Sequence, residues 1–247
     1  MPNFPPSGDR EAEEGKVSAD ELDRLIVGHG LWLSSDGREG AKFELPGANL
    51  IYGGFSQANL REANLAGACL FNANLRECNL AHADLTRANL EGASMVNVDL
   101  SNARLARAKL DKAVIPGVNF ENADLTGAHL RTTNLLSARF FRTRMRDADL
   151  TDANLAGATA RECDLDNVDF TEAKLMMVDF SDTSLRGAVF TRAVIFAATL
   201  NGADLSDADL RTAQGLSQEQ LDTAYGNRGT KLPAEFAGHA MTEKPSS

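Results

Sequence analysis

The sequence predicts a solenoid, a fold in which one short unit repeats along an axis. A five-residue word recurs 33 times from Ala48 to Leu210 without a break, and its last residue is Leu in 22 words and Phe in six. A helix needs apolar residues every three to four positions and a strand every second, so this period fits neither, whereas fixed-period repetition is typical of solenoids. The residue two places before the large one is Ala in 23 words, which indicates a second, narrower inward position.

The word has the form Ala-(Asp/Asn)-Leu-x-x, as in Ala58-Asn59-Leu60, and it resembles the word of the pentapeptide-repeat family. The resemblance covers about two thirds of the chain. It implies an all-β fold, a right-handed quadrilateral β-helix with one word on each of four faces and short capping helices at both ends. Residues 48–210 then form about eight coils, and at ~4.8 Å per coil the rod is about 38 Å long.

A short segment precedes the repeat. We expect residues 1–17, which are rich in Pro, Glu and Gly, to be a disordered tail. Residues 18–47 are expected to form an N-terminal helix and cap, because Ser18 to Glu21 matches a capping box and an apolar helical stripe follows. The candidate cap residues are Leu25, Ile26, His29 and Trp32. They are expected to cover the unpaired backbone of the first coil, with partner binding by His29 and Trp32 as the alternative.

After the repeat, residues 211–232 are expected to form a C-terminal cap. Ser217 and Gln220 match a second capping box, which predicts a short helix to about Tyr225. Residues 233–247 are expected to be a flexible tail. The chain is therefore one domain.

Composition narrows the class of protein. The three cysteines, Cys69, Cys78 and Cys163, occupy ordinary repeat positions without close-spaced Cys or His, so neither a disulfide framework nor a metal site is expected, and a cytoplasmic location suits them. The start of the chain lacks the features of a secretion signal, and no apolar run is long enough to span a membrane. The formal net charge of -10 argues against direct binding of nucleic acid.

An apolar column is the first candidate site on the outside of the solenoid. The residue just after the core position on one face reads, in successive coils, Val96, Pro116, Leu136, Ala156, Met176 and Phe196, with Met177 beside it. Contiguous exposed apolar surface marks an interface for self-association, as in a homodimer, or for another protein. The alternative, left open by the sequence, is that the C-terminal segment folds back over the column.

Charge is segregated along the chain. Residues 101–146 hold nine Lys or Arg against three acids, whereas residues 147–210 hold 13 acids against four bases. The candidate basic patch consists of Arg131, Arg139, Arg142, Arg144 and Arg146. The candidate acidic surface consists of Asp149, Asp152, Asp169, Glu172 and Asp209. Solvated surface is the ordinary role of such residues, although stacked carboxylates repel each other and hint at a partner.

Nothing in the sequence indicates an enzyme or a cofactor. The four His residues fall on different parts of the chain, none at metal-ligand spacing, and no Gly-rich phosphate loop is present. Carboxylates on a convex rod lack the cleft that would shift their pKa values. We therefore expect no catalytic residues.

The leading hypothesis is a non-enzymatic scaffold that presents its outer faces to a protein partner of unspecified identity. The resemblance implies an alternative, because some members of the family bind DNA gyrase in place of DNA and protect it from quinolones or toxins. A rod of ~38 Å matches only about 11 base pairs, so mimicry would need a dimer, and the basic patch has the wrong sign for it. An accessory role in a secretion or toxin system is a second alternative, for which no residue argues.

Overall fold

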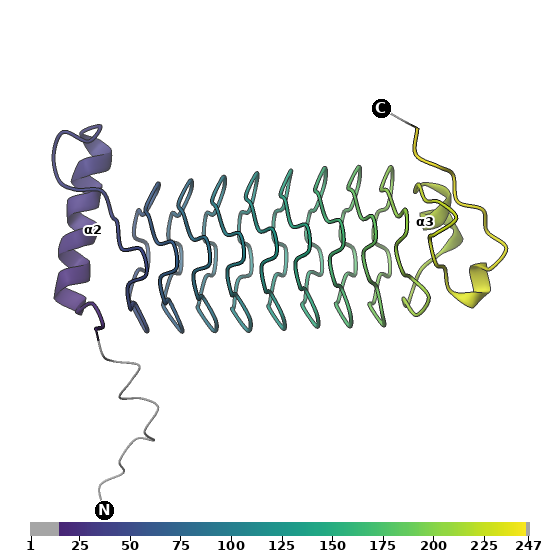
Figure 1. Ribbon diagram of the computed structural model, residues 1–247, viewed down its shortest axis with the longest axis horizontal. Helices are drawn as coiled ribbons and strands as arrows, with labels where there is room; N and C mark the ends of the chain where they lie inside the picture. Colours follow the sequence, from purple (N-terminus) through teal and green to yellow (C-terminus); the bar gives the residue numbers. More distant parts are fainter. Residues whose placement is uncertain (1–14, 246–247) are drawn as a thin grey trace, which may run out of the picture.

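The repeat forms a straight rod of stacked coils with a helix at each end (Figure 1). The computed structural model describes residues 15–245, so most of the tail expected at residues 1–17 lies outside the described residues. Parallel bridges join residues that are 20 positions apart, such as Asn49 with Cys69 and Cys69 with Asn89. Four words therefore make one coil.

Each word contributes a single bridged residue rather than a strand of several residues. That residue directly precedes the large core residue, and the two residues after the core residue form a turn. The second turn residue has a positive φ in every word from Gly47 to Asp207. A turn every five residues leaves room for only one bridge per word, so within the described repeat the β-structure consists of narrow ladders.

The bridged residues define the centres of four walls, which we number in chain order. Wall 1 is centred on the column from Asn49 to Asp209, wall 2 on Gly54 to Gln214, wall 3 on Asn59 to Thr199 and wall 4 on Glu44 to Asp204. The turn residues that follow a core residue lie at the edge between its wall and the next.

The core is a set of stacked inward columns. All 33 large positions are at most 2% exposed, and each buried Leu or Phe contributes about 1.5–3 kcal/mol. Aromatic rings stack on neighbours one coil away, with ring centroids 5.3 Å apart for Phe120 with Phe140 and for Phe170 with Phe190. The narrow inward position also accepts a hydroxyl when it is satisfied, as where Thr143 donates a hydrogen bond to the Phe120 carbonyl at 2.7 Å.

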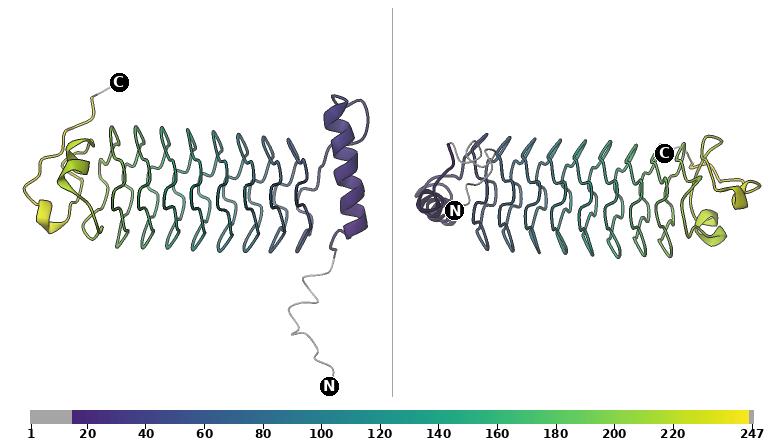
Figure 2. Two further views of the ribbon diagram at one scale, coloured as in Figure 1. Left: turned by 180° about the vertical axis from the view of Figure 1, so that it is seen from behind. Right: turned by 90° about the horizontal axis from the view of Figure 1, so that it is seen from below.

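Helix α2 (Ala19–Ser34) lies across the N-terminal end of the rod (Figure 2). Its N-cap, Ser18, accepts a hydrogen bond from the Glu21 N–H at 3.2 Å. The preceding residues Lys16 and Val17, expected in the disordered tail, instead pair with Asn49 of the first coil. No coil precedes the first one, so these residues pair with its backbone in the place that a preceding coil would have.

Helix α3 (Gln218–Asp222) and the short 3₁₀ helix η1 (Ala234–Phe236) lie at the other end of the rod. The capping box of Ser217 and Gln220 is present, but α3 ends at Asp222 rather than near Tyr225. Tyr225 instead forms bridges with Asp204 of the last coil and with Thr242. Part of the segment expected to be flexible, residues 233–247, is thus paired to the C-terminal cap at Tyr225. No helix in residues 15–245 has the length and apolar character needed to cross a membrane.

Candidate interaction surface

The apolar column lies on the edge between walls 2 and 3, because its residues occupy the first turn position after the wall 2 core residues. Backbone hydrogen bonds keep it in register over six coils, for example from the Gly117 N–H to the Leu136 carbonyl at 3.0 Å. Phe196 is 65% exposed, Met177 64% and Leu136 39%, and the other members are partly exposed. The edge position makes the column protrude, which the sequence alone did not indicate.

The centre of wall 2 extends this surface. Its outward residues, in successive coils, are Ser94, Val114, Asn134, Asn154, Lys174 and Val194. Lys174 is the single charged residue among these and the adjoining edge residues from Val96 to Ala197. Sorting the sequence in steps of 20 would have revealed this uncharged band, which extends the candidate interface beyond the column itself.

The C-terminal segment lies over the end of the rod and leaves the column exposed. The Gln220 side chain donates hydrogen bonds to the carbonyls of Ile195 and Ala198 at 3.1 and 2.8 Å, which fixes α3 at the last coil. Leu221 is buried there, while a hollow of about 400 Å³ separates α3 from the stretch that begins at Phe196. The alternative that this segment folds back over the column is therefore wrong, because its hydrogen bonds direct it to the rod end.

The five arginines of the basic patch do not form a free cationic surface. Each pairs with an acid in a neighbouring coil: Arg131 with Asp149 (3.5 Å), Arg139 with Glu121 (3.4 Å), Arg142 with Glu162 (2.9 Å), Arg144 with Asp124 (3.1 Å) and Arg146 with Asp164 (3.1 Å). Burial raises the pKa of Asp124, but hydrogen bonds from Thr126 and the charge of Arg144 outweigh it and lower the pKa overall. Charges that are segregated along the sequence are therefore interleaved in space.

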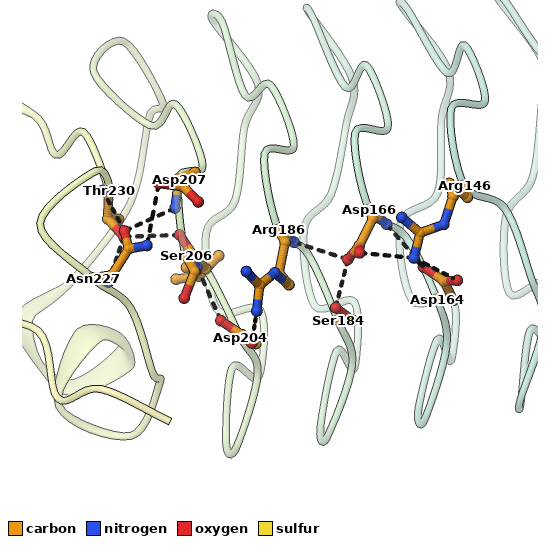
Figure 3. A network of polar contacts seen from close by, with 11 residues as sticks. Arg146, Asp164, Asp166, Ser184, Arg186, Asp204, Ser206, Asp207, Asn227 and Thr230 are labelled. Atoms are coloured by element: carbon orange, nitrogen blue, oxygen red, sulfur yellow. Dashed lines mark hydrogen bonds and ion pairs between the residues drawn. The ribbon is translucent and has the colours of Figure 1, made fainter. Parts of the chain in front are cut away.

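Figure 3 shows how far this pairing extends along wall 4. Arg146 also contacts Asp166 at 2.9 Å, and Asp166 accepts hydrogen bonds from the Ser184 hydroxyl and the Arg186 N–H. Arg186 in turn lies 3.7 Å from Asp204. These contacts link successive coils, so we expect them to stabilise the stacking of the rod.

The five candidate acidic residues share wall 1 and its edge with wall 2. Asp149 and Asp169 are adjacent bridge partners, as expected from their spacing. Asp149 pairs with Arg131 and Glu172 with Arg192, and hydrogen bonding from Arg211 lowers the pKa of Asp209. Of these five residues, only Asp152 and Asp169 form no ion pair within residues 15–245.

The candidate N-terminal cap residues are all part of α2. His29 is fully buried; its Nε2 bonds to the Arg61 carbonyl at 2.9 Å and its Nδ1 accepts from the Phe43 N–H at 3.0 Å. The His29 ring stacks on Trp32, and Leu25 and Ile26 pack against the core. Both imidazole nitrogens are occupied, so His29 is not available to a ligand in this arrangement.

Reactive or metal-binding geometry is not found in residues 15–245. No cluster of three or more His, Cys, Asp or Glu side chains could hold a metal ion there. Burial raises the pKa of Cys78 and of Cys163 to about 12, which keeps both as unreactive thiols.

The geometry thus defines a β-helical repeat protein. Family models agree: a pentapeptide repeat region matches residues 113–190, and pentapeptide repeats match residues 45–77, 78–115 and 173–211. Together these matches span the repeat. The chain belongs to the pentapeptide-repeat family.

Solved structures of the same kind are similar to it. HetL, a pentapeptide repeat protein involved in heterocyst differentiation regulation in the cyanobacterium Nostoc sp. strain PCC 7120, aligns with a TM-score of 0.58 at 23% identity, over 87% of this chain and 99% of HetL. This likeness shows the fold, a right-handed β-helix. Full-length QnrB1, a plasmid-mediated fluoroquinolone resistance protein, aligns with a TM-score of 0.30 at 16% identity, over 79% of this chain and 94% of its own. No curated protein sequence matches the chain.

Proposed function

We propose that this protein is a non-enzymatic, cytoplasmic scaffold that binds a protein partner through wall 2 and the apolar column. The observation that carries the proposal is the edge from Val96 to Ala197, which carries no charged residue in a chain of which 24% of residues are charged. Monomeric proteins rarely expose contiguous apolar surface without a use for it. The three cysteines are all free, which suits a reducing compartment.

The rod is well suited to such a role because its surface is preformed. Backbone groups along the rod bond to the next coil, as where the Met177 N–H donates to the Phe196 carbonyl at 3.0 Å. Recognition must therefore come from side chains rather than from strand addition along a wall. A rigid surface loses little conformational entropy when a partner docks.

Site-specific photo-cross-linking in the source cells tests the proposal. A photoreactive amino acid placed at Leu136, Met177 or Phe196 should give discrete cross-linked species, and the same group at the exposed positions Arg87 and Asn102 on the opposite side should not. Mass spectrometry identifies the cross-linked protein. Absence of cross-links specific to the column would contradict the proposal.

Binding to DNA gyrase in place of DNA is the weaker alternative. Five acidic residues on wall 1 and its edge favour it, but Asp149, Glu172 and Asp209 are already paired with arginines. A supercoiling assay with gyrase, with and without a quinolone, decides it: protection must be lost when Asp152 and Asp169 are both changed to Asn. No contact in the described residues favours an accessory role in a secretion or toxin system.

A further inference from the structure

We propose that the partner of wall 2 is a second copy of this chain, packed antiparallel about a two-fold axis that passes between the coils of Leu136 and Ala156. The inference rests on the proposed function, since it takes the same wall as the binding surface. Three features of wall 2 support it: the spacing of the coils, the sizes of the side chains and the charges on its edge with wall 1.

The spacing of the coils selects the kind of partner. Side chains of wall 2 recur once per coil, at the ~4.8 Å separation of paired strands, whereas a helix repeats every ~5.4 Å. A helix laid along the six coils would drift out of step by about 3 Å over five steps. Another copy of this wall has the same spacing and stays in step along its whole length.

The side-chain sizes match in this register. In four facing pairs along the edge, a two-fold axis places a larger side chain against a smaller one, and the larger one lies in the C-terminal half in all of them except Leu136 with Ala156. The facing pairs are Leu136 with Ala156, Met176 with Pro116, Met177 with Gly117 and Phe196 with Val96. At the wall centre, Asn134 faces Asn154, whose amides can bond to each other.

The charges on the edge between walls 1 and 2 match in the same register. Lys112 faces Glu172 there, and the facing coils bring Arg131 near Asp152 and Glu91 near Arg192, each one position out of register. Within each copy these residues already form the pairs Lys112 with Glu91, Arg192 with Glu172 and Arg131 with Asp149, so the contacts across the axis would join existing pairs into a network. At the wall centre Lys174 faces Val114, which is the one charged-to-apolar contact in this register. The basic middle and acidic far half of the chain therefore become complementary when one copy is reversed.

The parallel alternative lacks this match. A two-fold axis along the rod would lay the charged edge of one copy over the apolar column of the other, so that Arg131 would face Leu136. With a net charge of -10, two copies also repel each other generally. Wall 2 is where they can meet without adding like charges.

The size of the surface predicts a weak dimer. The column runs for about 24 Å over five coil spacings. A strip of this length and one wall wide is smaller than the roughly 800 Å² that each partner contributes to an interface of standard size. We expect a dissociation constant in the micromolar range or weaker.

Sedimentation equilibrium at roughly 10 µM to 1 mM protein measures this association directly. The unmodified chain should pass from monomer to dimer, and Phe196→Asp and Met177→Asp should each weaken the dimer at least tenfold with an unchanged circular dichroism spectrum. Asn102→Asp, which adds the same charge on the edge between walls 3 and 4, should leave association unchanged. A monomer throughout this range, or a dimer that both column variants leave intact, overturns the inference.

A mixing experiment tests the register. Val96→Lys and Phe196→Asp should each associate poorly alone, but an equimolar mixture should regain most of the dimer, because positions 96 and 196 face each other across the axis. No recovery in the mixture overturns the antiparallel register. A monomeric chain whose column still cross-links to a different protein would refute the inference while leaving the proposed function standing, whereas absence of any column cross-link would refute both.

Discussion

At the scale of single residues, the fold depends on a backbone conformation that most side chains avoid. Every word from Gly47 to Asp207 places its second turn residue at positive φ, and Gly occupies only eight of these 33 positions. For other residues this conformation costs roughly 1–2 kcal/mol. Burial of one Leu per word, about 1.5–3 kcal/mol, is large enough to offset it. The repeat tolerates the cost because each turn is followed by a buried residue.

Gly127 allows the backbone cost to be measured alone. Its φ is 63°, and an added Cβ would meet only the Arg107 side chain, at an ordinary contact distance of 3.5 Å. Gly127→Val should lower the free energy of unfolding by roughly 1–2 kcal/mol, and Gly127→Asn by clearly less, because Asn tolerates this region better. Urea denaturation measures both, and equal losses would show that the turn conformation is not the cause.

Leu135 and Leu136 are neighbours with opposite roles. Leu135 is fully buried and Leu136 is 39% exposed. Leu135→Asp should unfold the neighbouring coils, because a buried carboxylate without a partner costs several kcal/mol. Leu136→Asp should change stability by roughly 0.5 kcal/mol or less. Thermal unfolding followed by circular dichroism separates them, and similar losses would refute the assignment of inward and outward positions.

At the scale of elements, the two ends are held by different contacts. Helix α2 is attached through the buried His29, which bonds to Arg61 and Phe43. Helix α3 is attached through Gln220, and the chain beyond it pairs with the last coil at Tyr225. The neutral side chain of Gln220 does not titrate, whereas the imidazole of His29 can take up a proton, so we expect the N-terminal attachment to depend on pH.

Acidification should loosen α2. Desolvation by burial lowers the pKa of His29 below its ordinary value of 6.5; the hydrogen bond with the Arg61 carbonyl opposes this, Lys42 lowers the pKa further, and Glu62 opposes it to a smaller extent. Above 6.5 the imidazole is neutral in both folded and unfolded states, and its contribution to stability is complete. As the pH falls below 6.5 the unfolded state takes up the proton first, so stability declines through the lower folded pKa.

Trp32 reports this change, because it is the single Trp of the chain and stacks on His29. Its fluorescence should titrate with a midpoint below pH 6.5, and His29→Gln should abolish the transition. The matched variant His129→Gln, several coils away from α2 along wall 1, should retain it. A titration that persists without His29 would show that another group controls the helix.

The sequence predicts some of these features better than others. The buried positions, such as Leu125, follow from the five-residue period because each word carries its own inward residue. The ion pairs of Arg146 could not be found by counting charges along the chain, since its partners Asp164 and Asp166 lie 18 and 20 residues away. Local helix signals predict that α3 continues to about Tyr225, whereas it ends at Asp222. Tyr225 resumes backbone pairing with the last coil, a contact that those signals do not contain.

At the scale of the whole molecule, the rod is a one-dimensional array. Along the repeat, the bridges join each coil only to the coils directly before and after it. Stability is then approximately a sum of coil terms and nearest-neighbour terms. Any whole coil can in principle be removed without changing how the others pack.

Deleting residues 81–100 removes one coil and keeps every wall in register, so the shortened protein should fold and lose only a fraction of its stability. Deleting residues 81–98 removes almost the same mass but breaks a word, which places polar residues at inward positions. We expect that second variant to lose most of its cooperative unfolding transition in urea. Equal behaviour of the two deletions would show that register is not what holds the rod together.

The direction of the bonds between coils has a mechanical consequence. They run along the length of the rod, so a force pulling its two ends apart loads these bonds one coil at a time instead of shearing many at once. Each coil released would add 20 residues of slack, about 66–72 Å when fully extended. Under tension the protein should therefore yield early and in even steps, and act as an extensible tether rather than a stiff strut.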